Sequence, residues 1–294
     1  MSFTIATSVD EALAALAAGA RPVAGGSDLV VSARHGKAPL PTSIIAIDRL
    51  QELAEITASS TGIAIGALVN HATLETDATI VADFTALADA SALVGSPATR
   101  NVATLGGNVM NASPAMDTGA PLMVLGAVVE LRSSGGSRQV PITEIWTGPG
   151  RTVATPNELC TAIHIPHLPT NSGSAYVRLE YRRAMEIAVV GAAAAVTLDS
   201  AGNIAEAAIA LTAVAPTIIA VTGTAALIGL SIADAAAAVA VLASTQATPI
   251  SDLRASDRYR RHCVGVMASR ALSAAASRAR GELISVPVNR AGVS

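Results

Sequence analysis

Hydrophobic and polar positions alternate in short stretches along the first half of the chain. Ser8 and Glu11 match a capping box, in which two side chains satisfy backbone amides at the start of a helix. The alanine- and leucine-rich run behind them stops at Gly19, so the pattern predicts one helix there. Strands are predicted at residues 21–24, 43–47, 62–66 and 127–131, and helices from residue 29 and at residues 86–94.

The second half of the chain begins with the pattern of a β-hairpin. Apolar runs of strand length at residues 188–198 and 204–213 flank a polar, glycine-containing turn at residues 199–203. From about Pro216 the pattern is mostly helical. Residues 257–280 form the longest helical stretch, and its arginines predict a solvated face.

A cluster of breaking residues divides the chain. Proline, asparagine, glycine and serine gather at residues 168–174, which predicts a linker. The length of 294 residues also allows two domains, because a single domain usually has roughly 150. We expect one domain at residues 1–170 and a second at residues 174–290.

The composition predicts a core of small aliphatic side chains. Hydrophobic residues make up 51% of the chain, aromatic residues 2% and charged residues 14%, which excludes general disorder. So little charge fits a chain that covers much of its surface with partner subunits. Lysine and arginine number 19 against 22 aspartates and glutamates, and without a basic excess we expect no nucleic-acid partner.

Metal and membrane signals are missing from the sequence. The two cysteines, Cys160 and Cys263, lie far apart, and His164 and His167 have no cysteine or carboxylate partners nearby, so we predict no metal site. No apolar run reaches the roughly 20 residues of a membrane helix, and the start lacks the positive charge of a signal peptide. We expect a cytoplasmic chain with no integral membrane segment.

A first glycine loop, Ala24-Gly25-Gly26-Ser27-Asp28, lies between a predicted strand and a predicted helix. Adjacent glycines let backbone N–H groups approach an anion, and a helix start adds the positive end of its dipole. The loop is therefore a candidate phosphate cradle. On its own, a Gly-Gly turn before a helix is more often only a turn.

A second glycine loop, Thr104-Leu105-Gly106-Gly107-Asn108, continues through Asn111 and Ser113 to Asp117. Tandem glycines and closely spaced polar side chains suggest that backbone donors and side-chain partners converge here. Neither loop matches the dinucleotide fingerprint GxGxxG or the P-loop GxxxxGK[ST], so a Rossmann site and Mg-nucleotide hydrolysis lack their residues. Two cradles for one diphosphate fit the sequence better.

Several motifs, taken in order, carry a resemblance that covers nearly the whole chain. They are Ala24-Gly25-Gly26-Ser27-Asp28, Ile65-Gly66-Ala67, Gly95-Ser96-Pro97-Ala98-Thr99-Arg100-Asn101, Thr104-Leu105-Gly106-Gly107-Asn108, Ala112-Ser113-Pro114, Gly148-Pro149-Gly150, Arg182-Arg183 and residues 249–261. Through them the chain resembles the FAD-binding medium subunits of the molybdenum hydroxylases, the carbon monoxide dehydrogenase and xanthine dehydrogenase family.

The resemblance implies a fold and a cofactor site. The implied fold is α+β, with a two-part FAD-binding domain of the vanillyl-alcohol-oxidase (PCMH) type followed by a smaller α+β C-terminal domain. The implied cofactor-binding residues are Ala24, Gly25, Gly26, Ser27, Asp28, Leu29, Thr104, Leu105, Gly106, Gly107, Asn108, Asp117, Arg178 and Ile187. Arg178 stands where several relatives have lysine, and Ile187 is the apolar residue expected against the flavin ring, with Met185 and Glu186 beside it.

The resemblance also implies partners. A large subunit would carry a molybdopterin cytosine dinucleotide-type molybdenum cofactor, and a small subunit would carry two [2Fe–2S] clusters. This chain would accept electrons on FAD and pass them to an external acceptor, in an assembly expected to be a dimer of heterotrimers. The cysteine-rich insert of the benzoyl-CoA-type reductases is missing, which favours electron output. No acid–base pair is required in this chain, so no catalytic residue is assigned.

Two other functions stay open from the sequence. The chain could be a self-contained flavoenzyme of the same superfamily, or a scaffold that has lost FAD, although its intact glycines argue against the second. We interpret His71 as a helix-start histidine satisfied by local hydrogen bonds rather than a base or a flavin attachment point. Cys160, Trp146 and Tyr176 are interpreted as packing residues. The substrate and the electron acceptor are not specified by any motif.

Overall fold

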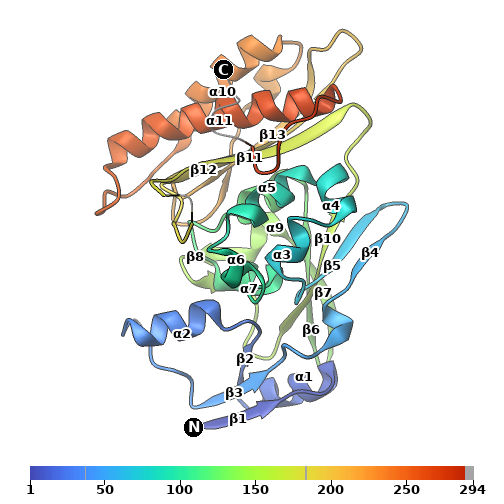
Figure 1. Ribbon diagram of the computed structural model, residues 1–294, viewed down its shortest axis with the longest axis vertical. Coiled ribbons are helices and arrows are strands. Elements are labelled where there is room, and N and C mark those ends of the chain that lie inside the picture. The colour runs from blue at the N-terminus through green and yellow to red at the C-terminus, as the bar shows by residue number, and fades with distance from the viewer. Residues whose placement is uncertain (37, 183, 289–294) are drawn as a thin grey trace.

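The computed structural model describes residues 1–36, 38–182 and 184–288, which form three layers of structure stacked along the long axis (Figure 1). A small N-terminal unit lies at the bottom of the view, a five-stranded sheet with short helices lies in the middle, and a four-stranded sheet covered by long helices lies at the top. The mixture of helices and strands confirms the predicted α+β class.

The N-terminal unit is a parallel sheet in the order β1-β3-β2, formed by β1 (Ser2–Ile5), β3 (Ser43–Ala46) and β2 (Arg21–Val23). Helix α1 (Val9–Ala17) packs on it through Val9, Leu13 and Leu16. Ser8 caps this helix, since its hydroxyl accepts from the N–H of Glu11 at 3.1 Å. The predicted helix and strands are confirmed, and α2 (Ser27–Arg34) follows β2 through the first glycine loop.

The middle layer is an antiparallel sheet in the order β4-β5-β10-β6-β7. Its strands are β4 (Ile56–Ala58), β5 (Gly62–Gly66), β10 (Leu159–Pro166), β6 (Val128–Ser133) and β7 (Gly136–Pro141). Short helices accompany it: α3 (His71–Leu74), α4 (Ala78–Asp83), α5 (Thr85–Leu93), α6 (Pro97–Arg100), α7 (Leu105–Asn111), α8 (Gly119–Val124) and α9 (Ile142–Ile145). The pair β8 (Trp146–Gly148) and β9 (Arg151–Thr152) and the short turn η1 (Gln51–Leu53) complete this layer. Strands β5 and β6 and helix α5 confirm three predicted elements.

The C-terminal sheet is antiparallel in the order β11-β12-β13-β14. It is built from β11 (Ser172–Leu179), β12 (Val190–Leu198), β13 (Ile204–Thr212) and β14 (Ile219–Ala220), and the short turn η2 (Thr224–Leu227) follows. The predicted hairpin is thus confirmed as β12–β13. Helices α10 (Ile232–Gln246) and α11 (Asp257–Ala279) contact each other, and α11 lies along β11 and β12. Helices α5 and α8 contact the same sheet, so it is shared between the two halves of the chain.

Two sequence predictions were wrong. Strand β11 begins at Ser172, inside the predicted linker, because its residues pair with β12 from Ser172 onward. The arginines of α11 do not all face solvent: Arg278 pairs with the buried Asp89 at 2.6 Å, and Arg260 is buried and donates to the carbonyl of Val189 at 2.6 Å. Tertiary partners therefore override the charge pattern at these positions.

In residues 1–36, 38–182 and 184–288, no helix combines the length and the apolar character needed to cross a membrane.

Candidate functional site

The two glycine loops lie against each other although they are far apart in the sequence. A Cβ atom at Gly25 would lie 1.8 Å from the carbonyl oxygen of Val102 and 3.1 Å from the backbone nitrogen of Ala103. Only a residue without a Cβ allows this approach. Gly25 therefore brings the start of α2 to the start of α7, as a joint cradle requires.

The first loop offers a row of free backbone donors. Gly26 has a φ of 66° and occupies the N-cap position of α2, whose first helical hydrogen bond runs from Val30 N–H to the Gly26 carbonyl at 3.0 Å. Within the described residues, no protein acceptor is recorded for the N–H groups of residues 25–29. Such a row at a helix start binds anions, because the donors and the helix dipole act together.

The second loop is built differently. The N–H groups of Leu105, Gly106 and Asn108 donate to the carbonyls of Val69, Ala67 and Thr104 at 2.9 Å each. The N–H of Gly107 donates to the Thr104 hydroxyl at 3.1 Å. The expectation of free backbone donors was therefore wrong for residues 105–108.

The glycine pair of the second loop serves packing instead. A Cβ on Gly106 would lie 2.5 Å from the Cβ of Ala67, so the loop could not sit on Ala67 with a larger residue. The groups this loop can still offer are side chains. The Thr104 hydroxyl accepts from Gly107 and keeps its own hydrogen, and Asn108 is half-buried with its amide nitrogen unpaired among the described residues.

Asp117 and Arg178 meet in a buried polar network. The Tyr176 hydroxyl donates to Asp117 Oδ1 at 2.8 Å, and Arg178 donates through Nη1 to Asp117 Oδ2 at 2.6 Å. Arg178 also donates through Nε to Glu180 at 2.5 Å. Burial raises the pKa of Asp117, and Arg178 and Tyr176 oppose that rise. The network joins the segment behind the second glycine loop to strand β11.

Tyr176 is more than the packing residue predicted from the sequence. It is fully buried, yet its hydroxyl orients Asp117, and burial raises its pKa well above the ordinary value. A Cβ on Gly191 would lie 2.4 Å from this hydroxyl, so the glycine makes room for it. Sequence spacing alone did not predict that β12 would pair Gly191 with Arg178 of β11 and so bring this glycine to the Tyr176 hydroxyl.

Residues 181, 182 and 184–187 lie where several of the quoted motifs meet. The N–H of Met185 donates to the carbonyl of Gly95 at 2.8 Å, and the Tyr181 hydroxyl donates to the carbonyl of Arg254 at 2.6 Å. The segment thus touches both the turn before α6 and the motif before α11. Ile187 is 47% exposed and free to contact a ligand, whereas Arg183 lies outside the described residues.

His71 does not match its interpretation. It begins α3 behind the capping residue Asn70, but both ring nitrogens are buried and have no hydrogen-bond partner among the residues that the structure describes. Burial, together with the nearby Arg100 charge, lowers the pKa of His71 to about 4, so the ring is neutral. The expected local hydrogen bonds are therefore wrong.

Cys160 and His164 show ordinary structural roles. Cys160 is buried in β10, as predicted, and burial raises its pKa to about 12, so it is held as an unreactive thiol. His164 Nε2 lies 3.4 Å from Glu130 Oε2. Among the described residues, no group of three or more metal-ligating side chains gathers.

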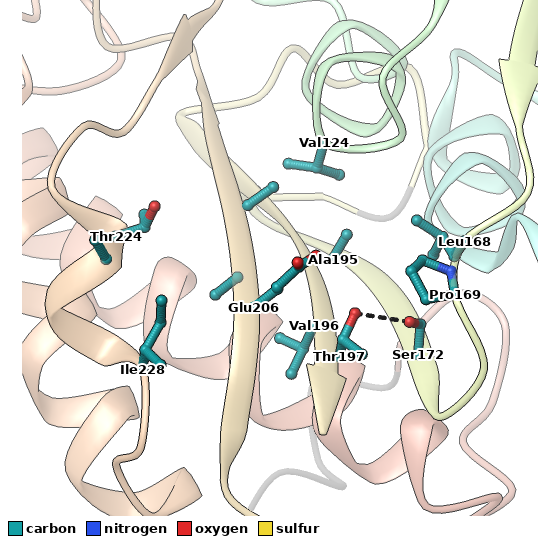
Figure 2. Close-up of a pocket in the computed structure, with 13 residues that line it drawn as sticks. Val124, Leu168, Pro169, Ser172, Ala195, Val196, Thr197, Glu206, Thr224 and Ile228 are labelled. Atoms are coloured by element: carbon teal, nitrogen blue, oxygen red, sulfur yellow. Dashed lines mark hydrogen bonds between the residues drawn. The ribbon is translucent and has the colours of Figure 1, made fainter. Parts of the chain in front are cut away.

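A separate groove of about 380 Å³ lies between the end of α8 and strands β12 and β13 (Figure 2). Its lining is mostly apolar, with Val124, Leu168 and Ile228 around Thr197 and the exposed Glu206. The Ser172 and Thr197 hydroxyls are hydrogen-bonded at 2.8 Å on its wall. None of the predicted cofactor residues lines this groove, so it is distinct from the glycine-loop site.

Two family models match the chain in succession. The model for the FAD binding domain in molybdopterin dehydrogenase matches residues 1–168, and the model for the CO dehydrogenase flavoprotein C-terminal domain matches residues 175–275.

Individual relatives are similar over nearly the full length. The chain is 32% identical to a xanthine dehydrogenase FAD-binding subunit of Escherichia coli O157:H7, over 90% of this chain and 91% of that one. It is 34% identical to the carbon monoxide dehydrogenase medium chain of Afipia carboxidovorans, over 89% and 90%.

Solved structures are also similar to the chain. The reconstituted CO dehydrogenase from Oligotropha carboxidovorans superposes with a TM-score of 0.90 at 30% identity, covering 95% of this chain and 98% of that one. Quinoline 2-oxidoreductase from Pseudomonas putida 86 superposes with a TM-score of 0.88 at 28% identity, with the same coverage.

Proposed function

Because the chain belongs to the family of FAD-binding medium subunits of the molybdenum hydroxylases, we propose that it is the electron-output subunit of such an enzyme. It is an oxidoreductase subunit that binds FAD. The observation that carries the proposal is the row of free N–H groups at residues 25–29, held against the second loop by Gly25.

The chain's own residues fit the diphosphate of FAD. The N–H groups of residues 25–29 would bind the diphosphate, and the Thr104 hydroxyl and the Asn108 amide would add donors from the second loop. Leu105, Gly106 and Gly107 would form the packed wall behind them. We assign Asp117 and Arg178 as polar neighbours of the cofactor and Ile187 as an apolar contact of the flavin.

FAD supplies electron transfer when it is bound, and the protein binds, orients and tunes it. Ala24 and Leu29 would flank the cradle, and Asp28, whose pKa is raised by burial, would place its carboxyl there. We also propose the division at residues 1–170 and 174–290, of which 289–290 lie outside the described residues. The shared packing of α5 and α8 on the C-terminal sheet would hold the two parts together.

The partners are proposed from the family. A small subunit with two [2Fe–2S] clusters would deliver electrons to this chain, and a large subunit would carry the molybdopterin cytosine dinucleotide-type molybdenum cofactor. The two cysteines support this division, because Cys160 lies in β10 and Cys263 in α11, both buried and unable to form a cluster ligand set. We propose a dimer of heterotrimers in the cytoplasm, with an external electron acceptor.

The experiment is to isolate the native complex through a tag on this chain. Subunit masses are measured together with the content of flavin, iron and molybdenum. The proposal predicts two partner subunits together with FAD, iron and molybdenum. Recovery of the chain alone, yellow and reducible by a small molecule, would make it a self-contained flavoenzyme instead. Recovery of a colourless chain that does not bind added FAD would make it a scaffold.

A further inference from the structure

The side chain of Asn108 is held from one side only. The Thr118 hydroxyl donates to Asn108 Oδ1 at 2.6 Å. Thr118 is fully buried and stands at the N-cap position of α8, but in the described part of the chain its side chain makes no capping hydrogen bond. Its hydroxyl hydrogen is donated to Asn108.

This hydrogen bond decides which end of the amide remains free. If the amide turned over, Nδ2 would donate to the Thr118 oxygen, and the hydrogen of this fully buried hydroxyl would lose the one acceptor recorded for it among the described residues. The orientation with Oδ1 toward Thr118 is therefore favoured, and it leaves the Nδ2 group without an acceptor in the described part of the chain. A diphosphate oxygen only accepts hydrogen bonds. Without Thr118, Asn108 could equally present its oxygen, which a diphosphate repels.

We propose that Thr118 is a positioning residue that makes Asn108 a hydrogen-bond donor toward the FAD diphosphate. The inference rests on the proposed function, since it assumes that the two glycine loops hold that diphosphate. Thr118 does not touch the cofactor in this account. It acts through the orientation of the Asn108 amide.

The backbone around Thr118 is anchored independently of its hydroxyl. Asp117 is held by Tyr176 and Arg178, and the carbonyl of Met116 accepts from the Thr212 hydroxyl at 3.0 Å. The Thr118 carbonyl accepts from the N–H of Leu122 at 3.0 Å. A change that removes only the hydroxyl should therefore leave the position of residue 118 intact.

The test compares Thr118→Val, which keeps the shape, with Thr118→Ser, which keeps the hydroxyl. The full-length chain is freed of flavin and titrated with FAD, with ADP as a second ligand that has the diphosphate, and with riboflavin as one that lacks it. Thr118→Val should lower the affinity for FAD and for ADP about tenfold each, as expected for the loss of one hydrogen bond to a charged group, and should leave the affinity for riboflavin unchanged. Thr118→Ser should bind FAD like the parent chain.

A double-mutant cycle with Asn108→Ala separates positioning from general destabilisation. In the Asn108→Ala background, Thr118→Val should cause no further loss of FAD affinity. Additive losses, or full FAD affinity in Thr118→Val, would overturn the inference.

A second variant covers the case in which Thr118→Val folds poorly. Asn108→Asp keeps an acceptor for Thr118 but presents an oxygen to the diphosphate, so FAD binding should fall at least tenfold while thermal unfolding stays close to that of the parent. Unchanged affinity in Asn108→Asp would also overturn the inference. If the parent chain binds no FAD, the proposed function itself fails, which is a different result from parent-like binding by the variants.

Discussion

Gly25→Ala is the most direct perturbation of the contact between the two glycine loops. The new Cβ would lie 1.8 Å from the Val102 carbonyl oxygen, where about 3.0 Å is the closest approach that Cβ atoms make. The loops would have to separate by at least 1.2 Å. A displacement of that size breaks a hydrogen bond, and each hydrogen bond to a charged group is worth about 1.5–3 kcal/mol. One lost bond therefore weakens FAD binding roughly tenfold to more than a hundredfold.

The assay is a titration of the flavin-free chain with FAD, followed by the change in flavin fluorescence. Gly135→Ala is the matched control, because its Cβ would meet only the Ser133 hydroxyl at an ordinary 3.6 Å. The control should bind FAD like the parent chain, and both variants should keep a cooperative thermal transition. Parent-like FAD affinity in Gly25→Ala would refute the argument that the loops must touch for the cofactor to bind.

Three further predictions concern buried groups. The pKa of His71 is about 4 in the folded state against an ordinary 6.5, so the unfolded chain takes up the proton first as pH falls. The free energy of unfolding should therefore fall by about 1.4 kcal/mol per pH unit as pH drops from 6.5 to about 4. Urea unfolding of His71→Leu at several pH values should show no such fall, and equal slopes in both proteins would contradict the neutral buried ring. Arg278→Met should lower the free energy of unfolding by about 3–5 kcal/mol, because it leaves the buried Asp89 without its ion pair. Arg258→Met, at an exposed position on the same helix, should lower it little. Similar losses in both variants, measured by urea unfolding, would argue that the ion pair is unimportant. Cys160, with its pKa raised to about 12, should resist iodoacetamide at neutral pH until the chain unfolds, as followed by mass spectrometry; rapid alkylation of the native chain would show that β10 opens.

Local chemistry explains what could be predicted of the fold. The N-cap hydroxyl of Ser8 and the polar turn between β12 and β13 specify their own structures through neighbouring residues, so the helix and the hairpin follow from the sequence. The ion pair of Arg278 does not follow from neighbouring residues. Its partner Asp89 lies on α5, far away in the chain, and only the shared packing on β11 brings the two together.

The residues of the site also divide into those whose role follows from their neighbours in sequence and those whose role depends on distant segments. Tandem glycines indicated that both loops matter, and the free amides of the first loop agree with that reading. The second loop could not be interpreted locally, because the amides of Leu105 and Gly106 are taken by the carbonyls of Val69 and Ala67 on another segment. Thr118 gave no signal except its place in a polar stretch, since its role depends on where α8 sets its hydroxyl relative to Asn108.

The central claim is that the paired glycine loops form a diphosphate site for FAD. The measurement that tests it most directly is calorimetric titration of the flavin-free, full-length chain with FAD, ADP and riboflavin. The account predicts one FAD per chain, displacement of FAD by ADP, and much weaker binding of riboflavin, which lacks the diphosphate. Riboflavin binding as tight as FAD binding, with no competition from ADP, would contradict it.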